Sequence, residues 1–346
     1  MTGRAGKETA PDTGADGVEA ALATLALRAG LGAFERGSLQ RLTAGASQQS
    51  WLFSTVADSL RRDFVLRRMP ETSPLLDGAI GPEREAAAIT AAGGAGVPVP
   101  MIRYVLSPGD GLGRGFISDR VEGETIPRKI LRDAAFAALR PRLAAECGTM
   151  LARLHGTDIA GLSDLPYVPP RAKLERLRAL YRRLGIRRPV FEAAFRWLED
   201  HMPSYDPARP PTLVHGDFRL GNLIVSPLGV AAVLDWEMAH IGDPVEDLGW
   251  LTVNSWRFGN RALVVGGFGR EADMLAAYAA AGGPPVQPGA IAFWRIFGSL
   301  NWGIGCLEMS LPASAGAVPS VERAMIGRRS SETEIDILDE LLEQAA

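Results

Sequence analysis

Residues 213–237, LVHGDFRLGNLIVSPLGVAAVLDWE, constrain the fold of this chain more than any other stretch. Two short apolar runs flank a Ser-Pro-Leu-Gly turn, which predicts a β-hairpin within sequence that is otherwise mostly helical in pattern. Three polar side chains, Asp217, Asn222 and Asp235, interrupt these apolar residues. A buried carboxylate destabilises a fold unless a partner, usually a cation, compensates it. The stretch therefore indicates a cation site mounted on a hairpin.

The register of such a hairpin brings the three polar side chains together. Asn222 directly precedes the first strand and Asp235 follows the second, so the two lie at the same end of an antiparallel pair. Asp217 lies in a Gly-containing loop that ends at the same edge. Hard oxygen ligands suit Mg²⁺ or Mn²⁺, and Mg²⁺ usually completes its coordination with substrate phosphates. The alternative is a set of ordinary turn-forming Asx residues, which three converging positions disfavour.

The N-terminal third of the chain has mainly strand patterns. Apolar spacing predicts a helix at residues 18–31 and another at 82–96, begun by Pro82 and ended by glycines. The remaining segments alternate in the manner of strands and are joined by turns at 44–47 and 57–62. The expected strands lie within 38–45, 49–56, 63–69, 97–107 and 114–124.

From about Ile130 onward the signal is mostly helical apart from the hairpin. We therefore expect an α+β chain with a small antiparallel-sheet lobe at residues 18–121. A mostly helical lobe is expected at 122–346. The expected helices lie at 141–155, 170–202, 244–256, 270–282, 288–308 and 330–344.

Composition narrows the classes of protein to which the chain can belong. No apolar run reaches the roughly 18 residues that a membrane helix needs, and the net charge of −3 argues against a general nucleic-acid binder. Only Cys147 and Cys306 are present, so no disulfide framework is expected and the default location is the cytoplasm. Residues 1–17 are polar and Gly-rich, which predicts a disordered leader rather than a signal peptide.

Charge is unevenly distributed along the chain. Residues 171–188 contain eight basic residues and one acid, whereas the tail at 330–343 contains six acids and no base. Solvated helix faces explain both runs, and an anion-binding surface is the alternative for the first. Nearly all cations are arginine, since lysine occurs only at Lys7, Lys129 and Lys173.

The polar residues of the hairpin stretch also form a known motif. His215-Gly216-Asp217 followed by Asn222 matches the H-x-D-x-x-x-x-N catalytic loop of kinases, and Asp235 stands at the position of their second metal-binding aspartate.

Later residues narrow the resemblance to one group of kinases. With Gly242-Asp243-Pro244 and Asp247, residues 38–310 resemble the aminoglycoside phosphotransferase and choline kinase group. That group includes bacterial phosphotransferase family proteins and the kinase-like domain attached to some acyl-CoA dehydrogenases. The resemblance implies a bilobal protein-kinase-like fold, with a nucleotide-binding lobe at residues 18–121 and a catalytic and substrate lobe at 122–346. It also implies transfer of the ATP γ-phosphate to a small-molecule hydroxyl, with GTP not excluded.

The resemblance also assigns roles by position. Asp217 would be the catalytic base for the substrate hydroxyl, and Asn222 and Asp235 would hold Mg²⁺ against the nucleotide phosphates. His215 is interpreted as a scaffold residue that hydrogen-bonds the loop backbone, and His155 as a buried histidine beneath the loop. Asp243 and Glu246 are expected to form a helix capping box.

The expected N-terminal lobe departs from the kinase pattern because residues 38–128 contain no lysine. Arg67 stands at the strand position that usually supplies the phosphate-binding lysine, with Glu85 as its best partner and Glu83 as the runner-up. Arginine can bind phosphate bidentately, so Arg67 can still bind the nucleotide phosphates, although with a different geometry. A nucleotide-binding protein with little or no catalysis is the alternative function, and an ordinary surface arginine is the alternative for Arg67.

The remaining nucleotide contacts are expected from backbone groups. Gly45 and Ser47 stand where the family has a phosphate-binding turn, and residues 117–121 would form the hinge that meets the base. Asp119 and Val121 are the hinge residues that we single out, with the side chain of Asp119 expected to face solvent.

Two questions about the acceptor stay open at this stage. The basic run at 171–188 favours an anionic or acyl-CoA hydroxy compound over a polycationic aminoglycoside. Five aromatic residues could line an apolar wall or simply pack in the core. They are Trp250, Trp256, Phe258, Trp294 and Trp302.

A third candidate function has a different chemistry. A metallohydrolase would use His215, Asp217, Asp235 and His240 as ligands, although such sites generally need more histidines and leave the hairpin unexplained.

Overall fold

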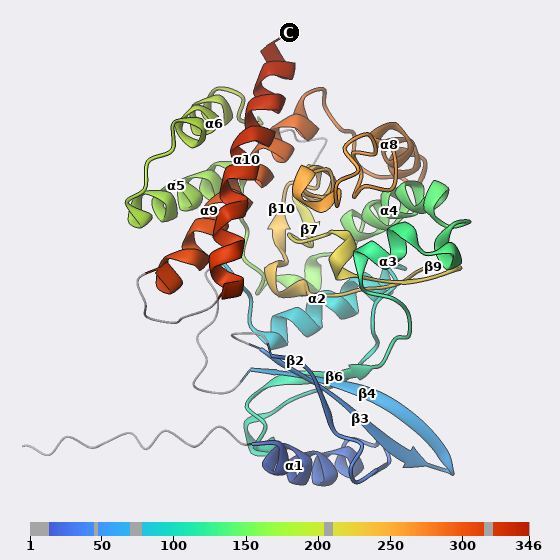
Figure 1. Ribbon diagram of the computed structural model, residues 1–346. Coiled ribbons are helices and arrows are strands. Elements are labelled where there is room, and N and C mark those ends of the chain that lie inside the picture. The colour runs from blue at the N-terminus through green and yellow to red at the C-terminus, as the bar shows by residue number, and fades with distance from the viewer. Residues whose placement is uncertain (1–13, 45–47, 70–77, 204–209, 315–320, 346) are drawn as a thin grey trace, which may run out of the picture. The chain divides into compact units, whose positions relative to one another are not determined.

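The computed structural model describes residues 14–44, 48–69, 78–203, 210–314 and 321–345. Contacts divide the chain into two compact units, drawn in Figure 1. The first unit consists of Met1–Gly93 and Val99–Val121, and the second of Gly94–Pro98 and Glu122–Ala346. Most of the expected leader, at residues 1–13, lies outside the described residues.

The first unit is built on one antiparallel sheet. Its strands are β1 (Ala33–Phe34), β2 (Gln40–Ala44), β3 (Gln49–Ala57), β4 (Leu60–Met69), β5 (Ile102–Val105) and β6 (Arg114–Asp119). The strand order is β1-β3-β4-β6-β5, and β2 also pairs with β3.

Two features of this sheet differ from the sequence prediction. The two-residue strand β1 was not expected. The turn between β3 and β4 is also tighter than the predicted 57–62, because Ala57 already pairs with Leu60. Asp58 and Ser59 both have positive φ, as a two-residue hairpin turn requires.

Helices cover the two faces of this sheet. Helix α1 (Ala15–Arg28) begins three residues before the expected position and buries Val18, Leu22 and Leu25 against Phe64 and Leu66 of β4. Because side chains alternate along a strand, Arg67 projects to the opposite face. Helix α2 (Pro82–Gly94), predicted almost to the residue, presents its buried Glu85 there.

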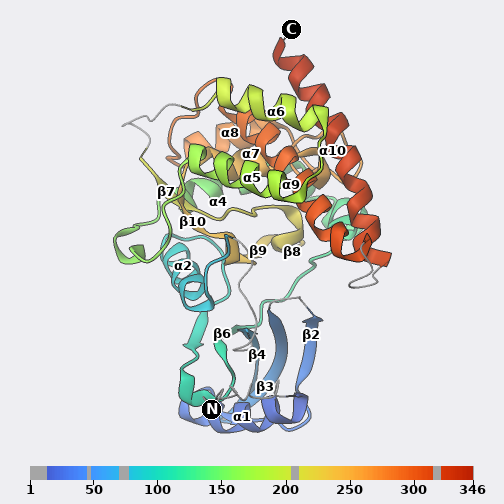
Figure 2. The same cartoon turned by 90° about the vertical axis from the view of Figure 1, so that its left-hand side faces the viewer.

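The second unit is mainly helical, as predicted. Helix α4 packs along α8, α9 packs against α7 and α10, and α5 and α6 pack against α9 (Figure 2). Helix α10 begins before the expected residue 330. Within the described residues, no helix is both long and apolar enough to cross a membrane. The helices are α3 (Pro127–Arg132), α4 (Arg140–His155), α5 (Pro170–Leu184), α6 (Pro189–Asp200), α7 (Val245–Leu251), α8 (Glu271–Ala280), α9 (Ala290–Ser314) and α10 (Val321–Ala345).

Two small β-structures in the second unit hold the loop that carries the motif. The predicted hairpin is confirmed as β8 (Leu223–Ser226) and β9 (Gly229–Val233). A second pair, β7 (Thr212–Val214) with β10 (His240–Gly242), was not predicted. The loop at residues 215–222 therefore begins at the end of one strand and finishes at the start of another, which fixes both of its ends.

Single-turn 3₁₀ helices complete the chain. They are η1 (Pro108–Asp110), η2 (Ala134–Phe136), η3 (Ala160–Leu162), η4 (Leu220–Asn222), η5 (Trp236–Met238) and η6 (Asn254–Trp256).

Candidate active site

His215 shapes the loop from inside. Its ring is fully buried, its Nδ1 accepts a hydrogen bond from the backbone N–H of Asp217 at 3.1 Å, and its Nε2 donates to the carbonyl of Leu234 at 3.0 Å. With Nδ1 acting as acceptor, the proton resides on Nε2. Both nitrogens serve the backbone, so the interpretation of His215 as a scaffold residue is confirmed.

Gly216 allows the loop to pass close to a neighbouring segment. Its φ is +80°, and a Cβ built there would lie 2.6 Å from the carbonyl oxygen of Met238. Contacts this short do not occur for real side chains, so the backbone path demands glycine.

Asp247 holds the loop from below. Its carboxylate accepts the backbone N–H groups of His215 at 2.8 Å and Gly216 at 2.9 Å. Its Oδ2 also contacts Nε2 of His155 at 3.3 Å, and Nδ1 of that ring bonds the Tyr278 hydroxyl at 2.8 Å. Burial alone would raise the pKa of the Asp247 carboxyl, but the interactions with His155 and His215 outweigh it and hold the pKa below its usual range. The prediction of a buried His155 beneath the loop is confirmed.

The carboxylate of Asp217 is oriented by three donors. Asn222 Nδ2 donates to Oδ2 at 2.7 Å, while Trp250 Nε1 and Arg219 Nε donate to Oδ1 at 2.8 Å and 3.0 Å. The side chain is 20% exposed, so solvent still reaches it. No sequence pattern indicated the Trp250 contact, and Arg219 was not singled out although it stands two residues after Asp217.

The open end of the hairpin carries the two expected metal ligands. Leu223 pairs with Val233, and the backbone N–H of Leu234 donates to the carbonyl of Asn222 at 2.8 Å, so Asp235 follows beside Asn222. Asp235 adopts a left-handed conformation with φ of 66°. The predicted arrangement of hairpin and loop is therefore present in the structure.

The donor set at this end fits a magnesium ion. Asn222 uses its amide Nδ2 to bond the backbone and carboxylate of Asp217, and its Oδ1 receives no donor from the described residues. No group of three or more His, Cys, Asp or Glu side chains in the described part of the chain is arranged to hold a metal. One amide oxygen and one carboxylate are a sparse set, which suits Mg²⁺ because that ion keeps waters and substrate phosphates.

In the first unit, Arg67 and Glu85 form an ion pair of 3.2 Å between Nε and Oε1. Glu85 is 1% exposed, and the side chain of Gln48 also accepts a hydrogen bond from Arg67. The runner-up partner Glu83 instead binds Arg114 at 2.6 Å. The pairing chosen from the sequence is present, whereas the role of Arg67 toward a nucleotide stays a prediction.

The structure describes only some of the other residues that were predicted to contact the nucleotide. Gly45 and Ser47 lie outside the described residues. The side chain of Asp119 was expected to face solvent, but it forms a bidentate pair with Arg103 at 2.7 Å, and its backbone N–H bonds Met101. Val121 is half-buried at the end of the first unit.

His240 belongs to a buried ionic cluster. Its Nε2 lies 3.3 Å from Glu246 and its Nδ1 lies 3.0 Å from the carbonyl of Met238. Lys173 also pairs with Glu246. Burial would raise the pKa of the Glu246 carboxyl, yet the charges of Lys173 and His240 hold it below its usual range. Both nitrogens of His215 bond the backbone, and no group of three or more His, Cys, Asp or Glu side chains among the described residues is arranged for a metal, so the structure gives no support for a metallohydrolase.

The predicted capping box is half right. Asp243 Oδ1 accepts the N–H of Val245 at 3.0 Å at the start of α7, and its Oδ2 accepts Trp294 Nε1 at 3.1 Å. The Glu246 side chain turns toward Lys173 and His240 instead of back to the backbone of Asp243. Pairing with a buried cation evidently outweighs the weaker capping bond.

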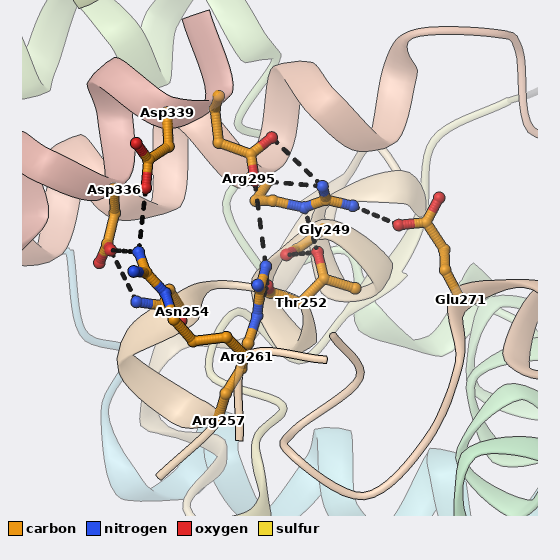
Figure 3. A network of polar contacts seen from close by, with 10 residues as sticks. Gly249, Thr252, Asn254, Arg257, Arg261, Glu271, Arg295, Asp336 and Asp339 are labelled. Carbon is orange, nitrogen blue, oxygen red and sulfur yellow. Dashed lines mark hydrogen bonds and ion pairs between the residues drawn. The ribbon is translucent and has the colours of Figure 1, made fainter. Parts of the chain in front are cut away.

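The two charge runs are more than solvated helix faces. Arg178, Arg183 and Arg188 pair with Glu199, Glu308 and Glu334. Acids of the tail on α10 pair with arginines of other segments of the second unit, as Figure 3 shows. These pairs are Arg261 with Asp336 and Asp339, and Arg295 with Glu340.

The aromatic residues divide between core and site. Trp294 is buried, whereas Trp250 packs on Trp256 with ring centroids 5.2 Å apart and also reaches Asp217. Trp302 lies 5.0 Å from Trp256 on its other side, and the guanidinium of Arg219 lies 4.8 Å from the Trp256 ring.

A family match of the sequence agrees with the geometry of the loop, the hairpin and the Arg67–Glu85 pair. The model of the phosphotransferase enzyme family matches residues 38–283. The chain belongs to that family. The described segments after residue 283, which include α9 and α10, extend beyond the matched region.

Relatives and solved structures agree with this assignment. Mouse acyl-CoA dehydrogenase family member 10 is 32% identical over 202 residues, which are 55% of this chain and 18% of that protein. The chain thus spans about a fifth to a quarter of the length of the first such relatives. A structure from Ralstonia eutropha, assigned to the aminoglycoside phosphotransferases, is 21% identical with a TM-score of 0.72, covering 94% of this chain and 98% of its own.

A second solved structure is an aminoglycoside phosphotransferase in a ternary complex with AMP-PNP and hygromycin B. It is 16% identical with a TM-score of 0.60, covering 94% of this chain and 99% of that one. At such identities the likeness concerns the fold, and it confirms the predicted α+β, protein-kinase-like fold class.

Proposed function

We propose that this protein is a small-molecule kinase that transfers the γ-phosphoryl group of ATP to a hydroxyl of its acceptor. The observation that carries the proposal is the 2.7 Å hydrogen bond from Asn222 Nδ2 to Asp217 Oδ2. It joins a candidate base and a candidate metal ligand in one rigid unit, mounted where the hairpin and the loop meet. Phosphoryl transfer requires little more of a protein than such positioning and charge neutralisation.

In this proposal Asp217 acts on the acceptor. Its carboxylate orients the acceptor hydroxyl and takes its proton while the hydroxyl oxygen bonds to the γ-phosphorus. The bond between that phosphorus and the β–γ bridging oxygen breaks, and ADP leaves with the electron pair. The donors Trp250 and Arg219 fix Oδ1, so the carboxylate presents one orientation to the acceptor.

Asn222 and Asp235 would hold Mg²⁺, which neutralises charge on the nucleotide phosphates when bound. In the first unit Arg67, oriented by Glu85, would bind the α- and β-phosphates in place of the usual lysine. The complex of the related phosphotransferase with AMP-PNP supports ATP as donor, and GTP is the competing donor.

The proposed acceptor is an anionic hydroxy compound, such as a hydroxyacyl-CoA. Its support comes from the basic run, in which Arg171, Arg176, Arg182 and Arg187 have no carboxylate partner among the described residues. The names of the acyl-CoA dehydrogenase relatives point to the same class. Charge reversal by Arg182→Glu should raise the KM for such an acceptor. An unchanged KM would remove this part of the proposal.

The second candidate is a nucleotide-binding protein without transfer activity, favoured by Arg67 at the position of the lysine. The proposed location for either function is the cytoplasm. A coupled assay of ADP release against sugars, aminoglycosides and hydroxyacyl-CoAs separates the two. ATP binding with no acceptor-dependent ADP release would support the non-catalytic protein, and acceptor-dependent release would exclude it.

A further inference from the structure

The second unit contains a cavity of about 730 Å³ that the proposed reaction does not use. It lies between α3, the start of α4 and the segment at 258–273. Cavities of this size accommodate small organic ligands. The lining residues that matter here are Arg128, Arg132, Arg140, Arg270, Phe258 and Phe268.

The charge of this lining is strongly positive. Four arginines and one acid, Asp273, line the cavity, in a chain whose net charge is −3. None of the four guanidinium groups has a carboxylate partner among the described residues. Elsewhere in the same unit arginines are neutralised, as Arg295 is by Glu271 and Glu340 in Figure 3. Unpaired arginines gathered around a hollow are therefore available to a ligand.

Arg140 is already oriented toward the cavity. Its Nη1 donates to the carbonyl of Ile130 at 3.1 Å and to that of Asp133 at 2.9 Å. These bonds satisfy carbonyls at the end of α3 and fix the guanidinium plane. Nε and Nη2 make no recorded bond within the described residues, so they can donate to an anion without rearrangement.

Two helices direct their N-termini toward the cavity. Helices α4 and α8 run parallel, because Gly269 lies against Ala144, Gly148 against Met274, and His155 bonds Tyr278. Both helices begin at the lining, at Arg140 and just after Arg270, and neither has a side-chain cap. Helix N-termini attract anions through the helix dipole and free N–H groups. In α4 the dipole dominates, because Pro141 has no N–H and the N–H of Arg142 bonds the carbonyl of Leu139. This field adds to that of the arginines.

The cavity is distinct from the phosphoryl-transfer centre. Its residues lie at the first turn of α4, whereas His155, which contacts Asp247 beneath the catalytic loop, ends the same helix. At about 1.5 Å per residue, the two ends of α4 are roughly 22 Å apart.

We propose that this cavity binds a phosphorylated organic anion. Arginine favours phosphate because its planar fork matches two phosphate oxygens at once. Phe258 and Phe268 supply an apolar wall for the organic portion. Phe258 has a φ of +50°, a conformation that a bulky residue rarely adopts and that often marks a ligand site. The proposal does not depend on the transfer reaction.

Calorimetric titration of the full chain with phenyl phosphate tests this site. Nucleotide and Mg²⁺ are left out, because a nucleotide is itself a phosphorylated organic anion, and the variants show whether phenyl phosphate binds in the cavity. The double variant Arg132→Ala/Arg270→Ala should weaken binding at least tenfold, because it removes two charged donors. The exposed single variant Arg128→Ala should weaken it to a smaller degree and guards against misfolding of the double variant.

The matched control is Arg196→Ala/Arg328→Ala, which removes the same charge from exposed positions of the same unit outside the cavity. It should bind phenyl phosphate within twofold of the wild type. Equal weakening in both double variants, or no binding by the wild type, would overturn the proposal. Inorganic phosphate should bind more weakly than phenyl phosphate. Equal affinity would show a site for the bare anion and contradict the assignment of an organic ligand.

Discussion

The indole Nε1 of Trp250 donates a 2.8 Å hydrogen bond to Oδ1 of Asp217. Trp250 lies on α7, the helix whose Asp247 holds the catalytic loop by its backbone. One short helix thus orients both the loop and the carboxylate that the loop carries. If Asp217 is the base, Trp250 is a positioning residue for it.

Replacing Trp250 with phenylalanine should lower kcat/KM by about 10- to 100-fold, since a hydrogen bond to a charged group contributes roughly 1.5–3 kcal/mol. Nucleotide affinity should stay within a few-fold, because the indole hydrogen bond goes to Asp217, the proposed base, and not to Asn222 or Asp235. The control is Trp302→Phe, which alters the same aromatic cluster without touching Asp217. Equal losses in the two variants would show that packing, and not the hydrogen bond, is responsible.

The Arg67–Glu85 pair should stabilise the first unit as well as bind phosphate. Arg67→Ala removes a cation from a carboxylate that is 1% exposed, which should lower the free energy of unfolding by about 3 kcal/mol. It should also weaken ATP binding at least tenfold. Urea unfolding and fluorescence titration measure the two effects.

Arg114→Ala is the matched control, because its partner Glu83 is largely exposed and such pairs contribute less than about 1 kcal/mol. If Arg67→Ala costs no more stability than Arg114→Ala, the buried pair is not a structural element.

The stability contributed by Asp247 should depend on pH in a defined direction. Its pKa is held below the unfolded value of about 3.9, so its contribution is fully present above that value and is lost as pH falls through the native pKa. Asp247→Asn should therefore cost about 3–5 kcal/mol at pH 7, and this deficit should shrink below about pH 4.

Denaturant unfolding of both proteins across this pH range measures the effect, with Asp339→Asn as an exposed control. A deficit that stays constant from pH 7 to pH 3 is incompatible with a carboxylate held ionised by its neighbours.

Comparing Gly216→Ala with a control variant separates two causes of lost stability, a close contact and backbone strain. The left-handed conformation alone costs roughly 1–2 kcal/mol for a side chain, and the contact with Met238 adds to it. Gly37→Ala is the control, since its φ is +76° but nothing lies within 4 Å of the added Cβ. Thermal unfolding should show a larger loss for Gly216→Ala, together with loss of activity. Equal losses would mean that the loop can move aside.

Local patterns were enough to predict the parts of the site that depend on local structure. The hairpin followed from its turn residues, and the placement of Asn222 beside Asp235 followed from the hairpin register. The strands β7 and β10 were missed because three buried residues carry no detectable period. Strand β1 was missed for the same reason, because it has only two residues.

Contacts between distant segments could not be predicted in this way. Arg188 pairs with Glu334 across 146 residues, so neither charge run revealed that it would be neutralised by another part of the chain. The bond from Trp250 to Asp217 depends in the same way on how α7 packs beneath the loop. Glu85 was chosen because the resemblance to kinases places the partner of the strand cation on the following helix, where Glu83 was the other candidate.

The most direct test of the account is the turnover of Asp217→Asn. With an acceptor identified by ADP release from the wild type, the variant should lose roughly 10²–10⁴-fold in kcat, the range expected for removing a general base. Its affinity for ATP should stay within a few-fold, because the amide preserves the size of the side chain. Turnover near the wild-type rate would contradict the assignment of Asp217 as the base, and with it the proposed mechanism.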